Sequence, residues 1–345
     1  MLNPALEVED QTNAIALIVA LADYAATFTI KSASAIETAR HCLIGALAGA
    51  LAALRDPERS ALIGPVVPGA LMPGGARVPG TSLELDPAQA AFCMGLMFCQ
   101  PDGTEHWPAL CSGRAADTFG AVLAAADYQA RKAVMEGKSP PRVRDMLAAM
   151  VKTLEIQGVL AAEGADDYRG IGTSAILLAR VASTALATAQ LGGNLGQIVG
   201  ALSFACAEGD LLLAADRRYH PARSDWARAD AISRAVRLAC QAIAAGRPSY
   251  LTALDLAAAD IAGKLLGAGP SQPRKVFGTA ISDQLATERQ PQEIAQLTAG
   301  FRAAVDQYFT SRQAERIKAL FAVPERLDDL PVNELLAALV TNGAR

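Results

Sequence analysis

The richest set of reactive side chains in this sequence lies within residues 90–120, between two apolar segments. A run of small and apolar residues ends at Cys99, and the next apolar run begins at Phe119. The residues between them that can do chemistry are Asp102, Thr104, Glu105, His106, Trp107, Cys111, Arg114 and Asp117. Loops held between buried helices are where a scaffold usually carries functional groups. We therefore expect the functional site in this stretch.

These side-chain types suit acid–base chemistry on an anion. A histidine such as His106 exchanges protons near neutral pH, and Asp102 can orient it or act as the base. Arg114, together with Arg180 and Arg223 further along the chain, can hold a carboxylate, because guanidinium binds carboxylate through two parallel hydrogen bonds. Elimination of water from a β-hydroxy acid needs a base for the α-proton, an acid for the leaving hydroxyl and cations on the carboxylate.

Plainer interpretations stay open beside this one. Asp102 and Asp117 also suit helix caps or turns, and His106 an ordinary loop. A zinc site from Cys99, Asp102, His106 and Cys111 matches no common spacing, and no G-x-S-x-G run marks a serine hydrolase. We expect no metal and no cofactor. The candidate catalytic residues are Asp102 and His106, and the candidate ligand-binding residues are Arg114, Arg180, Arg223, Trp107, Asp117 and His220.

Composition excludes several classes of protein. The net charge of −4 comes with both signs interspersed and no basic run, so we expect no nucleic-acid partner. The longest uncharged apolar run, Cys42–Leu54, is shorter than the ~20 residues of a membrane span, and acids stand near the N-terminus where a secretion signal has cations. The six cysteines form no C-x-x-C pair and are interpreted as free thiols. We expect a cytoplasmic protein.

The elements that must position the site are predicted to be helices. The chain is 52% hydrophobic, largely alanine and leucine, with 5% aromatic residues, which favours packed helices. We predict an all-α chain of about a dozen helices without a β-hairpin. Segment 64–81, rich in proline and glycine, is predicted to be a loop without regular structure.

Local signals set the expected helix ends. Thr12 or Asn13 is predicted to cap the first helix, and Ser34, with Glu37 three residues later, the second. Asp86-Pro87 reads as a cap followed by proline at the first helical position. Later helices are expected over residues 115–131, 143–161, 174–191, 194–207, 226–245, 292–309, 312–320 and 332–340, the helix at 174–191 being stopped by Gly192-Gly193.

Several runs of the sequence resemble the MmgE/PrpD family. They are ETARHCLIGALAGALAALRDPE from Glu37, LIGPVVPGALMPGGARVPGT from Leu62, LDPAQAAF from Leu85, LEIQGVLA from Leu154, LLARVAST from Leu177, DWARADAISRAVRLA from Asp225 and RPSYLTA from Arg247. The runs FTSRQAERI at Phe309 and LPVNELL at Leu330 resemble the C-terminal end of the family.

This resemblance implies a helical domain built from both chain ends, with an α/β lid domain inserted between them. Here about fifty residues separate RPSYLTA from the C-terminal helices, too few for that lid. We therefore expect a helical body over 1–255, a linker over 256–291 in place of the lid, and C-terminal helices over 292–345 packing back on the body. The resemblance also implies a homodimer, and the small-residue face of Leu43–Ala53 suits close helix contacts.

The resemblance also shows where the reactive residues of the family have been replaced. His106 stands at the family's threonine, Arg114 and Leu154 at its histidines, and Arg180 and Ser224 at its lysines. Two hypotheses follow. One is a divergent lyase-like enzyme that acts on a carboxylate- or carbonyl-bearing small molecule. The other is a non-catalytic, helical, dimeric binding or scaffold protein.

Overall fold

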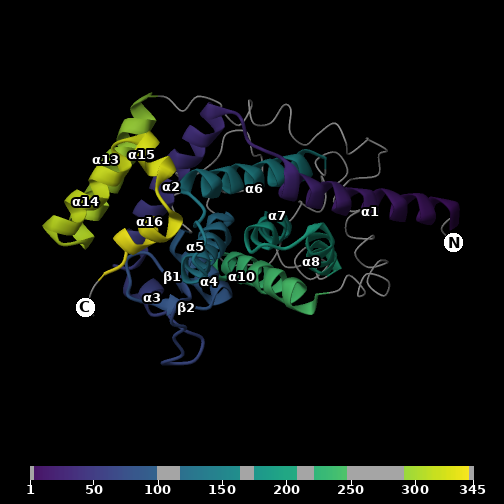
Figure 1. The fold of residues 1–345 in the computed structure, drawn as a ribbon, viewed down its shortest axis with the longest axis horizontal. Coiled ribbons are helices and arrows are strands. Elements are labelled where there is room, and N and C mark those ends of the chain that lie inside the picture. Colours follow the sequence, from purple (N-terminus) through teal and green to yellow (C-terminus); the bar gives the residue numbers. More distant parts are fainter. Residues whose placement is uncertain (1–3, 99–116, 164–174, 208–220, 247–290, 342–345) are drawn as a thin grey trace.

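The computed structural model describes residues 4–98, 117–163, 175–207, 221–246 and 291–341, drawn as ribbons in Figure 1. Side chains are described in these ranges except for residues 4–14, 162–163 and 221–224. The helices are α1 (Pro4–Thr27), α2 (Ala33–Ala53), α3 (Pro57–Ser60), α4 (Pro87–Phe98), α5 (Phe119–Met135), α6 (Val143–Glu163), α7 (Ala175–Gln190), α8 (Leu195–Ala207), α10 (Pro221–Ala245), α13 (Pro291–Tyr308), α14 (Ser311–Phe321), α15 (Pro324–Asp329) and α16 (Val332–Ala338). The all-α prediction is confirmed.

Helix ends follow the local signals where a side chain reaches the backbone of the first turn. The Asp86 carboxylate accepts hydrogen bonds from the backbone N–H of Ala88 and Gln89 and so caps α4, as predicted. At α2 the prediction that Ser34 is the cap was wrong. The cap is Ser32, whose hydroxyl accepts a hydrogen bond from the backbone N–H of Ala35, three residues later. Gly192 takes a φ of +89° after α7, a conformation that favours glycine.

Two predicted helix starts were also wrong. Helix α1 begins at Pro4, well before Thr12, and α10 begins at Pro221, before Trp226. In both cases a proline stands at the first helical position, where its missing N–H leaves no hydrogen bond unmade. The short helix α15, which begins at Pro324, had not been predicted.

The one pair of strands among the described residues lies within and just after the proline–glycine segment 64–81. Strands β1 (Ala76–Arg77) and β2 (Glu84–Leu85) pair antiparallel, with Ala76 opposite Leu85. The prediction of no hairpin was therefore wrong. The pairing depends on Gly75, because a Cβ there would lie 2.2 Å from the carbonyl oxygen of Leu85. No side chain other than hydrogen fits at this position.

The interior is a stack of alanine-rich helices with α4, α5, α7 and α10 at its centre (Figure 1). Small side chains let these helices approach closely. A Cβ on Gly95 of α4 would lie 2.8 Å from the Cδ1 atom of Ile232 and 3.0 Å from the Cα atom of Ala229, both on α10. A Cβ on Gly120 of α5 would lie 2.9 Å from the backbone nitrogen of Gly95. The three helices therefore meet backbone to backbone near the point where α4 ends and α5 begins.

The C-terminal helices pack on elements from the first half of the chain. Helix α13 lies along α2, α15 contacts α6 and α16 contacts α5 (Figure 1). A buried ion pair joins the Nη2 atom of Arg40 on α2 to both carboxylate oxygens of Asp328, at 2.9 and 3.0 Å. The Gly80 N–H also donates to the carbonyl of Leu339 at 2.7 Å.

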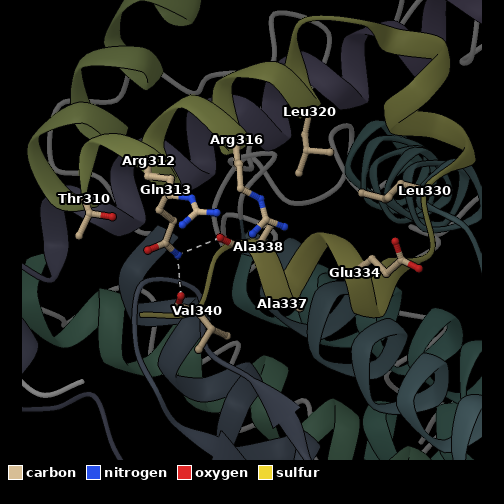
Figure 2. Close-up of a pocket in the computed structure, with 10 residues that line it drawn as sticks. All are labelled: Thr310, Arg312, Gln313, Arg316, Leu320, Leu330, Glu334, Ala337, Ala338 and Val340. Atoms are coloured by element: carbon tan, nitrogen blue, oxygen red, sulfur yellow. Dashed lines mark hydrogen bonds between the residues drawn. The ribbon is translucent and has the colours of Figure 1, made fainter. Parts of the chain in front are cut away.

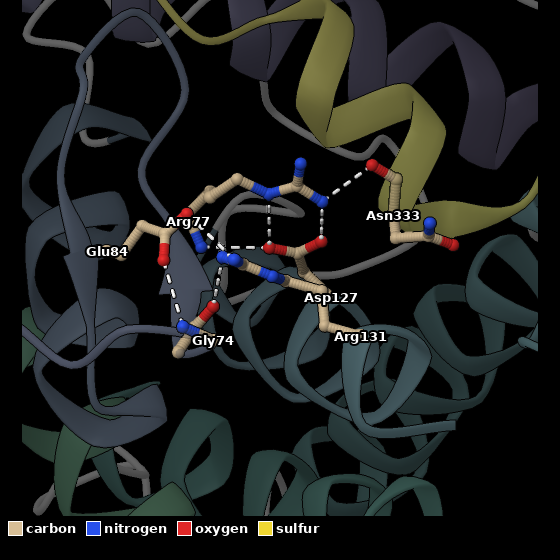
Figure 3. A network of polar contacts seen from close by, with 7 residues as sticks. Gly74, Arg77, Glu84, Asp127, Arg131 and Asn333 are labelled. Atoms are coloured by element: carbon tan, nitrogen blue, oxygen red, sulfur yellow. Dashed lines mark hydrogen bonds and ion pairs between the residues drawn. The ribbon is translucent and has the colours of Figure 1, made fainter. Parts of the chain in front are cut away.

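A second buried network ties β1, α5 and α16 together (Figure 3). The Asp127 carboxylate accepts three hydrogen bonds from Arg77, from its backbone N, Nε and Nη2 atoms, at 2.8, 3.1 and 2.6 Å. The same Nη2 atom donates to the carbonyl of Asn333 on α16 at 2.6 Å. Arg131, one turn after Asp127, bonds the carbonyl of Gly75 and the carboxylate of Glu84. One cluster thus fixes the hairpin and the C-terminal segment to the same helix.

The pH dependence of stability can test whether the side chain of Lys152 on α6 is buried. Its ammonium group donates to the carbonyl of Ala25 at 3.0 Å and lies 5.8 Å from the ring centroid of Tyr24 on α1. Burial lowers the pKa of Lys152 to about 8. Between that value and the ordinary pKa of about 10.4, the unfolded chain holds the proton and the folded chain does not. The contribution of Lys152 to stability should therefore rise with pH across this window.

We expect Lys152→Met to remove this rise, because methionine does not titrate. Urea denaturation at pH 7.5, 9 and 10 measures it, with Lys138→Met, on a side chain that is 71% exposed, as the control. A Lys152→Met variant with the same pH dependence as the wild type would contradict the assignment.

Candidate active site

A group of polar residues lies at the start of α5 and on α6, α7 and α10, near the point where the described chain resumes after residues 99–116. We call this group the polar layer; it consists of Asp117, Thr118, Thr153, Gln157, Arg180 and Arg228. Asp117 is 3% exposed and lies directly before α5. Its carboxylate Oδ2 atom accepts a hydrogen bond from the Nη1 atom of Arg228 on α10 at 2.5 Å. The start of α5 is therefore joined to the second turn of α10. Asp117, predicted as a ligand-binding residue or a cap, is engaged in an ion pair between helices.

The neighbouring Thr118 extends this layer to α6. It is fully buried, and its hydroxyl lies 2.9 Å from the hydroxyl of Thr153. The Thr153 hydroxyl donates to the carbonyl of Met150 at 2.7 Å, so Thr118 is the donor in the pair. The Gln157 side chain, one turn further, donates to the carbonyl of Thr153 at 3.2 Å. Every hydroxyl in this group has a defined direction, which makes the layer rigid.

Arg180 supplies a buried positive charge on α7. It is 5% exposed, and burial lowers its pKa to about 10, so it stays protonated at neutral pH. The nearby Arg234 lowers its pKa further, whereas Asp230 opposes that effect. Both neighbours lie on α10 within two turns of Arg228. Arg180 and Asp117 therefore face the same section of α10, from α7 and from the start of α5.

Two further buried polar residues, on α6 and α7, were missed by the sequence analysis. Glu155 on α6 is 1% exposed. Ser183 on α7, one turn after Arg180, is fully buried, and its hydroxyl meets no hydrogen-bond partner among the described residues. Both stand inside runs already quoted, LEIQGVLA and LLARVAST. The available signal was a polar residue on the apolar side of a helix, where burial without a hydrogen bond is costly.

Most of the predicted site residues lie outside the described part of the chain. These are Asp102, His106, Trp107, Arg114 and His220. Arg223 lies in the first turn of α10, within the stretch whose side chains are not described. Of the predicted set, the structure therefore places the side chains of Asp117 and Arg180. Leu154, at one of the replaced family positions, is completely buried in the core.

The elements around this layer define what it can do. Segments 99–116, 164–174 and 208–220 connect α4 to α5, α6 to α7 and α8 to α10. A buried, protonated arginine such as Arg180 can hold a carboxylate and stabilise negative charge that develops on it. No described helix is long and apolar enough to cross a bilayer.

Comparison with known proteins adds an independent line of evidence. The family model described as the MmgE/PrpD N-terminal domain matches residues 19–249, which run from within α1 past the end of α10. A protein of Cupriavidus necator named 2-methylcitrate dehydratase is 39% identical over 276 residues, 78% of this chain and 55% of that protein. Proteins of the same name from Salmonella typhimurium and Escherichia coli are each 42% identical over 243 residues, 68% of this chain and 49% of each relative.

The matched region holds α5, α6, α7 and α10, the helices whose residues form the polar layer. The chain spans about half the length of the curated relatives it matches. With two thirds of its residues inside the family model, and with identities near 40%, this chain belongs to the MmgE/PrpD family.

Proposed function

We propose that the chain is a divergent, lyase-like member of its family that abstracts a proton from a carboxylate- or carbonyl-bearing small molecule. The observation that carries the proposal is the buried cation Arg180, 5% exposed, within a layer of oriented polar groups. A guanidinium at such a position can bind a carboxylate through parallel hydrogen bonds and stabilise negative charge that develops on it. The family relationship favours a substrate that carries a carboxylate.

The chemistry is a simple elimination. In this proposal a base, Asp102 or His106, removes the α-proton, and the electron pair of the C–H bond moves toward the substrate carboxylate. Arg180, with Arg114 and Arg223, stabilises this enolate-like charge. The electron pair then forms the carbon–carbon double bond as the β-hydroxyl leaves, taking a proton from the acid partner. The products are an unsaturated acid and water.

We infer that the substrate is not 2-methylcitrate, the molecule in the names of the relatives. By resemblance, Leu154 and Ser224 stand where the family has a histidine and a lysine. Leucine has no proton to exchange, and serine carries no positive charge. We also propose that the linker 256–291 replaces the lid, with 1–255 as the helical body and 292–345 as the returning helices. One wall of the site would then be open, which suits a larger ligand.

Proton exchange tests the proposed function without knowledge of the final product. A panel of β-hydroxy acids and keto acids, 2-methylcitrate included, is incubated with the protein in deuterated water and followed by proton NMR. We expect loss of the α-proton signal for at least one compound other than 2-methylcitrate. Absence of exchange across the panel would favour the alternative, a non-catalytic helical dimer that binds a partner.

Arg180 has a specific expected role in this scheme. Because Arg180 binds the substrate carboxylate, we expect Arg180→Met to raise KM about tenfold or more, the loss of one charge-assisted hydrogen bond. Initial-rate kinetics measure this effect. A thermal melt of the variant separates it from any loss of stability, because Arg180 also interacts within the protein interior. A melting temperature that collapses, or a KM that does not change, would remove Arg180 from this role.

We also propose a homodimer. The predicted contact face Leu43–Ala53 cannot form it, because residues such as Leu43, Leu47 and Ala50 are buried inside the chain, where α2 packs against α4, α6 and α13. The surface that supports a dimer is apolar and exposed, with Val66 80%, Val67 62% and Leu71 55% exposed. These residues are close in sequence, and a large exposed apolar patch often marks an interface.

We expect the dimer to bury ~1,600 Å² in total. Light scattering at micromolar concentration should give twice the chain mass of 35.8 kDa. The double change Val66→Ser and Val67→Ser should return it to the monomer mass. A wild-type protein that runs at the monomer mass would refute the proposal.

A further inference from the structure

A groove of about 600 Å³ lies between α14 and α16 (Figure 2). It is at the C-terminal end of the molecule, among the helices drawn in yellow-green in Figure 1, and none of its lining residues belongs to the polar layer described above. One wall is formed by Arg312, Arg316 and Leu320 of α14, and the other by Glu334, Ala337 and the following Val340. The volume is typical of a site that binds a ligand or a short peptide.

Hydrogen bonds from one side chain join the two walls of the groove. The Gln313 amide donates to the carbonyls of Ala338 and Val340, at 3.1 and 2.7 Å, and so joins α14 to the end of α16 (Figure 2). Ile317, on the inner face of α14, is completely buried. Leu335 and Leu336 of α16 are at most 1% exposed. The two walls therefore have a fixed separation, and an occupant does not have to open them.

The two arginines on one wall have no acid to meet. Neither Arg312 nor Arg316 forms an ion pair with a described residue, although acids are close in sequence. Glu315 and Asp306 both pair with Lys318, at 2.6 and 2.7 Å. Asp329 pairs with Arg142 at 3.3 Å. Figure 2 shows both arginine side chains reaching from α14 toward α16, into the groove.

The placement of these arginines is unfavourable for the helix alone. They stand four residues apart on α14, where like charges repel. Arg312 also lies in the first turn, where the helix dipole disfavours cations. An anionic occupant would relieve both effects. The opposite wall carries one exposed acid, Glu334, toward the other end of the groove, and otherwise apolar atoms.

We propose that this groove binds an extended acidic segment of a partner protein, with alternating acidic and apolar residues. Side chains four apart on a helix are separated by about 5–6 Å at Cβ. Residues i and i+2 of an extended chain share one face and are about 6.8 Å apart. Two acids at i and i+2 therefore match Arg312 and Arg316. The apolar residue between them points to the opposite side, toward Ala337 and Val340.

The test uses fluorescence anisotropy with three labelled peptides and the full chain. The probe is Glu-Val-Glu-Val-Glu, with Glu-Gly-Glu-Gly-Glu and Lys-Val-Lys-Val-Lys as comparisons. We expect the first to bind, the second to bind at least fivefold more weakly, and the third not to bind. Arg312→Gln with Arg316→Gln should weaken binding of the first at least tenfold. Added salt should weaken it as well, because these charges are exposed.

Two further variants keep the test specific. Arg302→Gln removes an exposed arginine of α13 outside the groove and should leave binding unchanged. Ala337→Trp places a large side chain on an exposed position of the apolar wall and should abolish binding while both arginines remain. The proposal is overturned by absence of binding or by an equal loss in Arg302→Gln. It is also overturned if millimolar glutarate or phosphate displaces the peptide, since a small anion would then be the ligand.

Discussion

Replacing Asp127 by alanine is expected to lower the free energy of unfolding by about 3–5 kcal/mol, the usual cost of removing one partner of a buried ion pair. The Asp127 side chain is fully buried, and that of Arg77 is 11% exposed. Without the carboxylate, the guanidinium keeps its charge in a site that water reaches poorly. Three hydrogen bonds to Asp127 are lost at once, and the contact that holds Asn333 becomes misaligned.

Urea denaturation followed by circular dichroism measures this change, with the slope of the transition as a check on two-state behaviour. Glu136→Ala is the matched control, because Glu136 forms an exposed pair with Lys138 and should leave the midpoint nearly unchanged. The double variant Arg77→Met with Asp127→Leu should recover part of the loss, since apolar pairs often replace buried ion pairs well. A midpoint for Asp127→Ala equal to that of Glu136→Ala would show that the network does not hold the fold.

His106→Ala is expected to lower kcat about 10²-fold or more on a substrate identified by proton exchange, the usual contribution of a general acid or base. The expectation rests on the proposed function and on the residue types in 99–116. Histidine is the side chain whose ordinary pKa allows it to give and take protons near neutral pH. Asp102→Asn should have an effect of similar size, because the amide neither accepts a proton nor carries charge.

His41 provides the matched control for this measurement. It is half-buried on α2 in a small pocket with Arg302 and Lys318, away from the polar layer of α5, α7 and α10. His41→Ala should keep kcat and KM unchanged. If His106→Ala and His41→Ala behaved alike, the chemistry would have to be assigned to other residues, while the family assignment and the fold would be unaffected.

Asp127 acts on the attachment of the C-terminal segment, and His106 on the proposed proton transfer. If His106→Ala lost activity because it unfolds, its urea denaturation curve would shift relative to that of the wild type. A loss of chemistry alone would leave the His106→Ala curve at the wild-type position.

The sequence alone determined the features that depend on a few neighbouring residues. The cap at Asp86, the stop at Gly192 and the all-α class follow from side chains acting within one turn or from apolar periodicity. The family resemblance also came from local runs, and the six runs between Glu37 and Ala239 fall inside the matched region. Errors at this level were small shifts, such as Ser32 in place of Ser34, because both are serines within reach of the first turn.

Only the tertiary structure decided which distant residues meet. Arg77 and Asp127 are fifty positions apart, and Asp117 and Arg228 are 111 positions apart, so no local pattern pairs them. The hairpin at β1 and β2 formed in a segment rich in proline and glycine because Gly75 permits close approach to Leu85. Glu155 and Ser183 became site candidates through burial, which is a property of the packed helices and not of the sequence around each residue.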